Sequence, residues 1–261
     1  MSTAVGFRGY REWKGWTAES FGVCGPVQAA YYAAELARAR LETGRPLDVM
    51  EVGFGNGEFA GWAHAQGFSY TGSELVPELR RQATAAGFRV YDGDCGRLPA
   101  DLGPQSLDLV VAFDVLEHLE LEALEALLAG VHVVLRPGGC LLARVPSGDS
   151  PFGRATQHGD LTHRLTLGTS AVEQLAARHR FLVVDVGAPR LPLRGVGLRR
   201  AARRALLLAA QKMIGGIINA TFHANQRRVI TGSLVFVLRK PAGTATAQRD
   251  DRLHPSPAGT P

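Results

Sequence analysis

An acidic residue followed by three alternating glycines is the feature of this chain whose spacing points most directly to chemistry. The segment reads Glu51-Val-Gly53-Phe-Gly55-Asn-Gly57. Glycines let backbone N–H groups approach a ligand closely, and a helix that begins after such a turn directs its N-terminus at that ligand. A dinucleotide-binding turn needs a small residue at the position of Glu58, where a carboxylate would crowd and repel a pyrophosphate. The turn therefore favours a ligand that carries an ammonium group and no phosphate, and it disfavours an NAD-linked oxidoreductase.

A second group of reactive side chains lies about 100 residues later, in Gln157-His158-Gly-Asp160-Leu-Thr-His163. Imidazole has a reference pKa of about 6.5 and is the usual base for taking a proton from a hydroxyl group near neutral pH. His158 and His163 are the candidate bases, and Asp160 is the candidate carboxylate that orients one of them. The alternative is that these residues only hydrogen-bond the loop or hold a substrate. His118 is a third candidate base, with capping of the helix that follows it as its alternative role.

Apolar segments of strand length alternate with helical patterns and would position these residues. We expect strands at 47–52, 68–72, 88–91, 107–113, 140–145, 181–186 and 233–238. We expect helices at 26–41, 77–86 and 119–135, one that ends at Gly67, and one that begins at a Ser170–Glu173 capping box. The Arg-Pro-Gly-Gly sequence at 136–139 should turn the chain into the fifth strand. This alternation predicts a parallel sheet with helices on both faces.

In this order, the motifs closely resemble those of the class I S-adenosylmethionine-dependent methyltransferases. The acidic GxGxG motif of that family matches Glu51, Gly53, Gly55 and Gly57, and the resemblance implies that this loop wraps the methionine part of the cofactor. It also implies a Rossmann-like methyltransferase fold with a seven-stranded, mostly parallel sheet. The resemblance spans about residues 47–187, and five motifs in order are a far more specific signal than one glycine turn.

The resemblance extends to the acids that follow the next strands. Glu74 matches the acid that holds the ribose hydroxyls in the family, and Asp94 in Gly93-Asp94-Cys95 matches the acid beside the adenine, with Asp92 as the alternative. We include Cys95 with this adenine position. Asp114, in Phe113-Asp114-Val-Leu-Glu-His118, would contact the amino group of the cofactor or cap the following helix. We assign no metal site, although these acids and Asp160 leave a dependence on Mg²⁺ open.

The pattern predicts a single methyltransferase domain at 45–240, preceded at 1–44 by an aromatic segment and a helix. The aromatic segment would form a lid over the ligand or simply pack on the core. A basic helical insertion is expected at 188–228, before the last strand. Residues 241–261 are rich in Ala, Thr, Gly and Pro, and we expect a disordered tail.

The formal net charge of +5 is distributed unevenly. Residues 1–185 carry 16 Lys+Arg and 22 Asp+Glu, whereas residues 186–261 carry 13 and 2. Arg199, Arg200, Arg203 and Arg204 precede an apolar segment, so the insertion would contact an anionic membrane surface or the phosphates of an acceptor, with a solvated surface helix as the alternative. Nucleic acid is not an expected partner, because the basic region lacks aromatic residues for base stacking.

No apolar run has the form of a secretion signal or reaches the roughly 18 residues of a membrane span. The three cysteines form no disulfide or zinc pattern. We therefore expect a cytoplasmic protein, with peripheral contact at the inner face of the membrane as a further expectation.

The loop after the fifth strand is similar to that of bacterial methyltransferases of cell-surface polysaccharide assembly. This similarity implies O-methylation of a glycan, or of a lipid-linked or nucleotide-linked saccharide. The alternatives are a small-molecule or quinone-precursor methyltransferase and a non-catalytic, membrane-associated scaffold that binds the cofactor.

Overall fold

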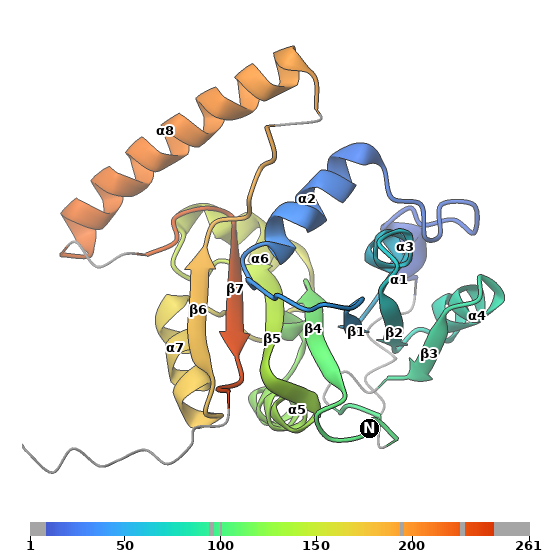
Figure 1. Ribbon diagram of the computed structural model, residues 1–261. Coiled ribbons are helices and arrows are strands. Elements are labelled where there is room, and N and C mark those ends of the chain that lie inside the picture. Colours follow the sequence, from blue (N-terminus) through green and yellow to red (C-terminus); the bar gives the residue numbers. More distant parts are fainter. Residues whose placement is uncertain (1–8, 94–96, 100, 194–195, 225–227, 243–261) are drawn as a thin grey trace, which may run out of the picture.

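A seven-stranded sheet organises the chain, whose computed structural model describes residues 9–93, 97–99, 101–193, 196–224 and 228–242. The strand order is β3-β2-β1-β4-β5-β7-β6 (Figure 1). Only β7 pairs antiparallel to its neighbours β5 and β6 among the described strands. The strands are β1 (Asp48–Val52), β2 (Ser69–Glu74), β3 (Arg89–Asp92), β4 (Leu107–Phe113), β5 (Leu135–Pro146), β6 (Leu182–Gly187) and β7 (Ser233–Arg239). The expected fold class is confirmed.

Helices cover both faces of this sheet because successive side chains of its central strands point to opposite sides. On one face, α5 (Leu121–Val134) and α7 (Thr169–Arg178) pack against residues such as Val110 and Leu141. On the other face, α2 (Pro26–Leu36) and α3 (Glu58–Ala65) pack against residues such as Val111 and Leu142. The rigid sheet that results holds the ends of its strands, where the candidate residues lie, in fixed positions.

Three local predictions were wrong: the end of helix α2, the turn at 136–139 and the N-cap of helix α7. Helix α2 ends at Leu36 rather than at residue 41, and Arg40 has a φ of 45°, a left-handed conformation through which an α-helix cannot continue. Residues 136–139 do not form a separate turn but a bulged part of β5. The predicted capping box at Ser170 is absent. Gly168 is the N-cap of α7, and the carboxylate of Asp149 accepts the backbone N–H of Thr169 at 3.0 Å.

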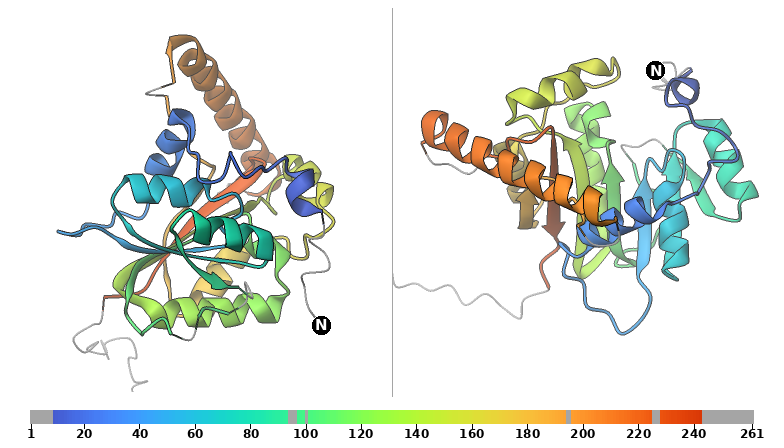
Figure 2. Two further views of the ribbon diagram at one scale, coloured as in Figure 1. Left: turned by 90° about the vertical axis from the view of Figure 1, so that its right-hand side faces the viewer. Right: turned by 90° about the horizontal axis from the view of Figure 1, so that it is seen from above.

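The basic insertion contains one long helix, α8 (Leu198–Phe222), of which no residue is buried. It extends past the edge at which the parallel strands end and covers neither face of the sheet (Figures 1 and 2). Within the described residues it is long and apolar enough to cross a membrane, with a mean hydropathy of 1.4 over 18 residues, although one such helix is weak evidence for a span. Five of its large apolar side chains are exposed by at least 59%, namely Leu198, Leu206, Met213, Ile217 and Phe222, and Leu207 and Ile214 are exposed by 44% and 42%.

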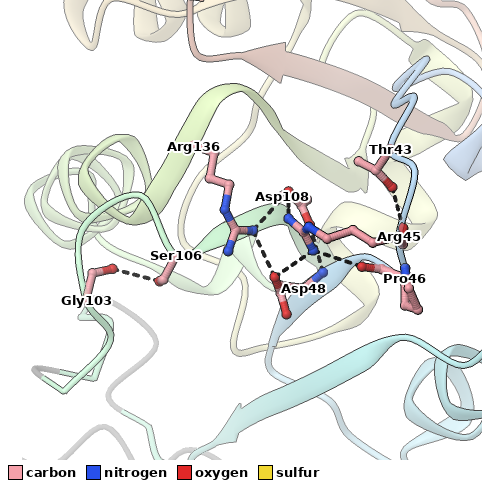
Figure 3. A network of polar contacts seen from close by, with 8 residues as sticks. All are labelled: Thr43, Arg45, Pro46, Asp48, Gly103, Ser106, Asp108 and Arg136. Atoms are coloured by element: carbon pink, nitrogen blue, oxygen red, sulfur yellow. Dashed lines mark hydrogen bonds and ion pairs between the residues drawn. The ribbon is translucent and has the colours of Figure 1, made fainter.

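At the opposite ends of the strands, where β1 and β4 begin, a network of charged side chains links these two strands (Figure 3). Asp108 is 5% exposed and accepts hydrogen bonds from Arg45 and Arg136, at 2.8 and 2.9 Å. Its second oxygen accepts the backbone N–H of Asp48 at 2.8 Å. The side chain of Asp48 binds the same two arginines. The network therefore sets the register of the two strands whose other ends carry the glycine turn and Asp114.

Asp108→Ala should lower the free energy of unfolding by about 2 to 3 kcal/mol, since it removes three hydrogen bonds to a buried carboxylate. The control is Asp101→Ala, whose carboxylate is 60% exposed and pairs with Arg89 at 3.6 Å; this change should cost less than about 0.5 kcal/mol. Denaturant unfolding followed by circular dichroism measures both. Equal midpoints for the two variants would show that the network does not hold the strands.

Candidate functional site

A cavity of 520 Å³ opens where β1, β2 and β4 end. In an open α/β sheet this is the edge at which ligands bind, beside the point where the strand order reverses. The cavity is lined by five of the residues predicted from the sequence, Glu51, Gly53, Gly55, Glu74 and Asp114. Their convergence from three strands is the geometry that a cofactor site requires.

The glycine turn joins β1 to α3 in a conformation that other residues rarely adopt. The φ angles of Gly53, Gly55 and Gly57 are 68°, 53° and 68°. A Cβ at Gly55 would lie 2.9 Å from the Trp16 ring, and one at Gly57 would lie 2.6 Å from the Phe21 ring. Gly57 therefore packs beneath an aromatic ring and does not line the cavity. All three glycines are needed for backbone shape and close packing.

Glu74 is tied to this turn by hydrogen bonds that its carboxylate accepts. One oxygen accepts the Gly55 N–H at 2.9 Å and the other accepts the Val76 N–H at 3.0 Å. Burial raises the pKa of Glu74, while the backbone donors oppose this effect. The remaining lone pairs of such a carboxylate can accept hydrogen bonds from vicinal hydroxyl groups, as a ribose supplies.

Glu51 lies on the wall of the cavity and is 4% exposed. It accepts a hydrogen bond of 2.6 Å from the Tyr70 hydroxyl. Burial raises the pKa of Glu51 well above its ordinary value, and the charges of Glu74 and Glu58 act in the same direction, whereas the hydrogen bond from Tyr70 opposes them. A cationic ligand group would restore the ionised form. Sequence reasoning missed Tyr70, because nothing about a tyrosine in a strand marks it as a partner of this acid.

Glu58, at the first position of α3, also lines this cavity. It accepts a hydrogen bond of 3.2 Å from the Tyr32 hydroxyl, and burial raises its pKa. The helix N-terminus, where a dinucleotide-binding protein would place a phosphate, therefore carries an acid. The expectation that the turn rejects a pyrophosphate agrees with this placement.

Asp114 follows β4 and forms a bidentate ion pair, the Asp114–Arg144 fork, which the sequence did not indicate. Arg144 of β5 donates from Nε to one Asp114 oxygen at 2.9 Å and from Nη2 to the other. Its Nη1 donates to the Tyr31 hydroxyl at 2.9 Å. Asp114 caps no helix, so that alternative was wrong. The fork lies on the wall that the first cavity shares with a second one.

The second cavity, of 410 Å³, connects the loop after β5 with the first cavity. Lys14, Asp114, His118 and Arg144 line both cavities. The residues that the second cavity adds are mostly polar and include Glu117, Thr156, Asp160 and His163. A ligand there would lie directly beside whatever occupies the first cavity.

Of the two histidines predicted in this loop, the structure brings only His163 to the cavity. His163 Nδ1 donates to the Gln157 carbonyl at 2.9 Å, and its Nε2 lies 3.9 Å from Asp160 Oδ2. Thr162 donates two hydrogen bonds to Asp160, and these bonds together with the nearby imidazoles lower the pKa of Asp160 despite its burial. His158 is exposed near the end of α6 (Arg154–Gly159), because Ala155, Thr156 and Gly159 form the face that lines the cavity.

His118 and Glu117 complete this cluster from the short helix η2 (Leu116–His118). The His118 ring packs edge-on against the His163 ring, with centroids 4.6 Å apart. Burial lowers the pKa of His118, and the charge of His163 acts in the same direction. Glu117 is 1% exposed, and burial together with the charge of Asp114 raises its pKa to about 8. Glu117 was missed as a functional residue, although it stands in the Phe113–His118 motif beside two residues that were named.

The predicted adenine contacts Asp94 and Cys95 lie outside the described residues. The alternative, Asp92, is 83% exposed and pairs with Arg80 at 2.9 Å, and it does not line the first cavity. The apolar lining of that cavity includes Trp16, Phe54 and Leu79, the last from α4 (Pro77–Ala85). These side chains could stack with a planar ring.

The N-terminal segment lies across the opening between the two cavities. Trp16 and Lys14 line the first cavity, and Trp13 and Lys14 line the second. The short helix α1 (Tyr10–Trp13) leads into this segment. The placement favours the lid over simple packing on the core, since Trp16 covers the glycine turn.

The first cavity suits the S-adenosylmethionine that the motifs imply. A turn that a Cβ would fill allows close approach of a ligand, two buried carboxylates face cationic and hydroxyl groups, and the apolar wall suits an adenine ring. Glu51, Gly53, Gly55 and Glu74 would hold the cofactor.

Comparisons with known proteins agree with this geometry. Residues 27–185 match the family described as Methyltransferase domain. An S-adenosylmethionine-dependent methyltransferase from Mesorhizobium loti is 20% identical with a TM-score of 0.55, over 82% of this chain and 100% of that chain. Another from Archaeoglobus fulgidus is 18% identical with a TM-score of 0.55, over 79% and 94%. No curated protein matches the chain.

A third solved structure contains bound ligands. It is the Burkholderia thailandensis 1,6-didemethyltoxoflavin-N1-methyltransferase with 1,6-didemethyltoxoflavin and S-adenosylhomocysteine, 22% identical with a TM-score of 0.50. It covers 82% of this chain and 79% of that chain. At these identities, the likeness to all three structures shows the shared fold.

Glu74→Ala should weaken the binding of S-adenosylhomocysteine about 10- to 100-fold, because a charge-assisted hydrogen bond is worth roughly 1.5 to 3 kcal/mol. Titration calorimetry measures this change. The control is Glu78→Ala in the first turn of α4, whose carboxylate is 52% exposed and pairs with Arg81. Similar affinities for the two variants would remove Glu74 from the cofactor site.

Proposed function

The chain belongs to the class I S-adenosylmethionine-dependent methyltransferases, and we propose that it methylates a hydroxyl group of a glycan or of a lipid-linked or nucleotide-linked saccharide. The observation that carries the proposal is the second cavity, which shares four residues with the cofactor cavity and places several hydrogen-bonding side chains on its wall. An acceptor in the second cavity would present an oxygen directly to the bound methyl donor.

The lining of the second cavity supports a saccharide as the acceptor. Carboxylates, imidazoles, a guanidinium and a hydroxyl group supply donors and acceptors at several points, and a polyhydroxylated ring can engage many of them at once. The similarity of the loop to polysaccharide methyltransferases points in the same direction.

Methyl transfer to oxygen forms one bond and breaks another, and it also releases a proton. The acceptor oxygen bonds to the methyl carbon while the carbon–sulfur bond breaks, so S-adenosylhomocysteine leaves. The hydroxyl proton passes to His163 Nε2, whose lone pair is available because Nδ1 donates its proton to the Gln157 carbonyl. Asp160, 3.9 Å away, stabilises the imidazolium that forms. Trp13 and Lys14 of the N-terminal segment line the acceptor cavity, where they would help to align the acceptor and limit access of water.

Helix α8 supports a location at a membrane surface. Arg199, Arg200 and Arg203 are exposed at its start, whereas Arg204 is half-buried and donates to the Pro192 carbonyl at 2.7 Å. The exposed apolar side chains follow along the same helix. Basic residues beside an apolar surface favour anionic lipid, with about 1 kcal/mol for each charge. We propose that α8 lies on the inner face of the membrane and brings the enzyme to lipid-linked acceptors.

The acceptor class is tested by a screen with labelled cofactor. The panel contains sugar nucleotides, lipid-linked saccharides, and catechols of the kind found in quinone precursors. Label in a saccharide supports the proposal. Label in the catechols alone would replace it with a small-molecule methyltransferase.

His163→Ala should lower kcat by roughly 10² to 10⁴, the usual contribution of a general base, and leave the affinity for S-adenosylhomocysteine unchanged. His158→Ala is the matched control from the same loop and should retain kcat, because its side chain is exposed outside the cavity. Steady-state kinetics and calorimetry supply the two readouts. Retained kcat in His163→Ala would exclude its role in the reaction.

Replacing Arg199, Arg200 and Arg203 together by Gln should abolish sedimentation with anionic vesicles. Salt should release the unchanged protein, because exposed charges are screened over about 8 Å at physiological ionic strength. The control replaces Arg81, Arg89 and Arg178, which are equally basic, at least 57% exposed and far from α8 in the chain. Equal binding to anionic and neutral vesicles, or equal loss in both triple variants, would contradict a membrane role for α8.

A further inference from the structure

Three side chains of the second cavity form a cluster with the composition of a metal site. Glu117, His118 and His163 each offer one ligand atom, and these atoms all lie within 4.8 Å of one another. They come from two segments, η2 and the loop after β5, whose contact is fixed where the Arg164 N–H donates to the Glu117 carbonyl at 2.7 Å. The fold, and not sequence proximity alone, therefore assembles the cluster.

Hydrogen bonds at Nδ1 set the tautomer of both imidazoles, so that Nε2 of each ring carries the lone pair. The Gln157 carbonyl can only accept, so His163 Nδ1 carries the proton and Nε2 has a lone pair. Thr162 Oγ1 donates its proton to Asp160 and therefore accepts from His118 Nδ1, at 2.8 Å. His118 Nε2 is thus also a lone-pair donor. Metal-binding histidines are usually fixed in this way, through a carbonyl or carboxylate behind the ring.

The third member of the cluster is an unsatisfied carboxylate. Glu117 is 1% exposed, and neither of its side-chain oxygens accepts a hydrogen bond from any residue that the structure describes. The imidazole of His163 lies beside it, with Nε2 3.9 Å from Glu117 Oε1. A buried carboxylate without donors is costly, and a cation is one of the few groups that removes this cost.

These observations point to a divalent transition-metal site, and we infer that Glu117, His118 and His163 bind a metal ion such as Zn²⁺, Mn²⁺ or Fe²⁺ in the second cavity. Two imidazoles and one carboxylate suit these ions better than Mg²⁺, which prefers oxygen ligands throughout. Three protein ligands leave coordination positions open, and all three residues line the second cavity. A hydroxyl or phosphate oxygen of the acceptor would occupy them.

The inference rests on the proposed function only for the identity of that oxygen ligand. With a metal ion present, the lone pair of His163 binds the ion and does not take the proton itself. The cation would hold the acceptor oxygen beside the methyl donor and lower the pKa of its hydroxyl group, so that the hydroxyl proton would pass to solvent water instead of to His163. Metal binding itself is measurable without any acceptor.

The test is a titration of the full chain, without a polyhistidine tag and stripped with EDTA, with Co²⁺, whose visible absorption reports imidazole and carboxylate ligation. We expect saturation at one equivalent, displacement by Zn²⁺ and little competition by Mg²⁺. Glu117→Gln, His118→Ala and His163→Ala should each weaken Co²⁺ binding by at least about 10-fold. The controls Glu122→Gln and His158→Ala, both exposed and outside the cluster, should bind as the unchanged chain does.

Thermal unfolding followed by circular dichroism shows that each variant is folded. Absence of saturable Co²⁺ binding to the unchanged chain, or undiminished binding in the three cluster variants, would overturn the metal site. Methylation of a saccharide at full rate in EDTA would contradict the site and leave the proposed function intact. Conversely, Co²⁺ binding as predicted, together with methylation of catechols alone, would contradict only the acceptor.

Discussion

The pKa values of Glu51, Glu58, Glu74 and Glu117 are all raised, in each case chiefly by burial. Carboxylates that have been removed from water favour any ligand that restores their ionised form, either a cation or a hydrogen-bond donor. Glu51, Glu58 and Glu74 surround the first cavity, so that cavity suits an ammonium and hydroxyl groups and repels phosphate. In the second cavity, Glu117 likewise favours a cation or a hydrogen-bond donor. Buried glutamates near the carboxyl ends of the strands thus account for the choice of cofactor and for the metal site that we infer.

The two ends of the central strands differ in how completely their polar groups are paired. At the edge where β1 and β4 begin, Asp108 is satisfied by two arginines and a backbone N–H, and the network fixes strand register. At the other edge, polar groups are left incompletely paired, as Glu117 shows. The satisfied edge and the apolar layers on both faces stabilise the fold, which allows the functional edge to keep buried charge. Helix α8 belongs to neither layer, and its exposed apolar surface is the reason for our proposal that it contacts a membrane.

The sheet could be predicted from the sequence because strand and helix periods alternate clearly, and because a glycine turn after the first strand marks the ligand edge. Glu51, Glu74 and Asp114 could be placed there for the same reason. Such sequence signals are local, which explains why some functional residues were not predicted. Tyr70, Arg144 and Glu117 act through partners 19, 30 and 46 residues away, and no local pattern marks them. His158 was named because it adjoins Asp160 in sequence, but the rotation of one short helix leaves it exposed.

Recognition of a cationic amino acid group by Glu51 is the central claim, and calorimetry with two related ligands tests it most directly. S-adenosylhomocysteine carries the ammonium group, whereas 5′-methylthioadenosine keeps the adenosine and sulfur but lacks the amino acid part. The account predicts a micromolar dissociation constant for the first ligand and at least about 10-fold weaker binding of the second. It also predicts that Glu51→Gln weakens only the binding of S-adenosylhomocysteine. Equal affinities for the two ligands in the unchanged chain, or an equal effect of Glu51→Gln on both, would contradict it.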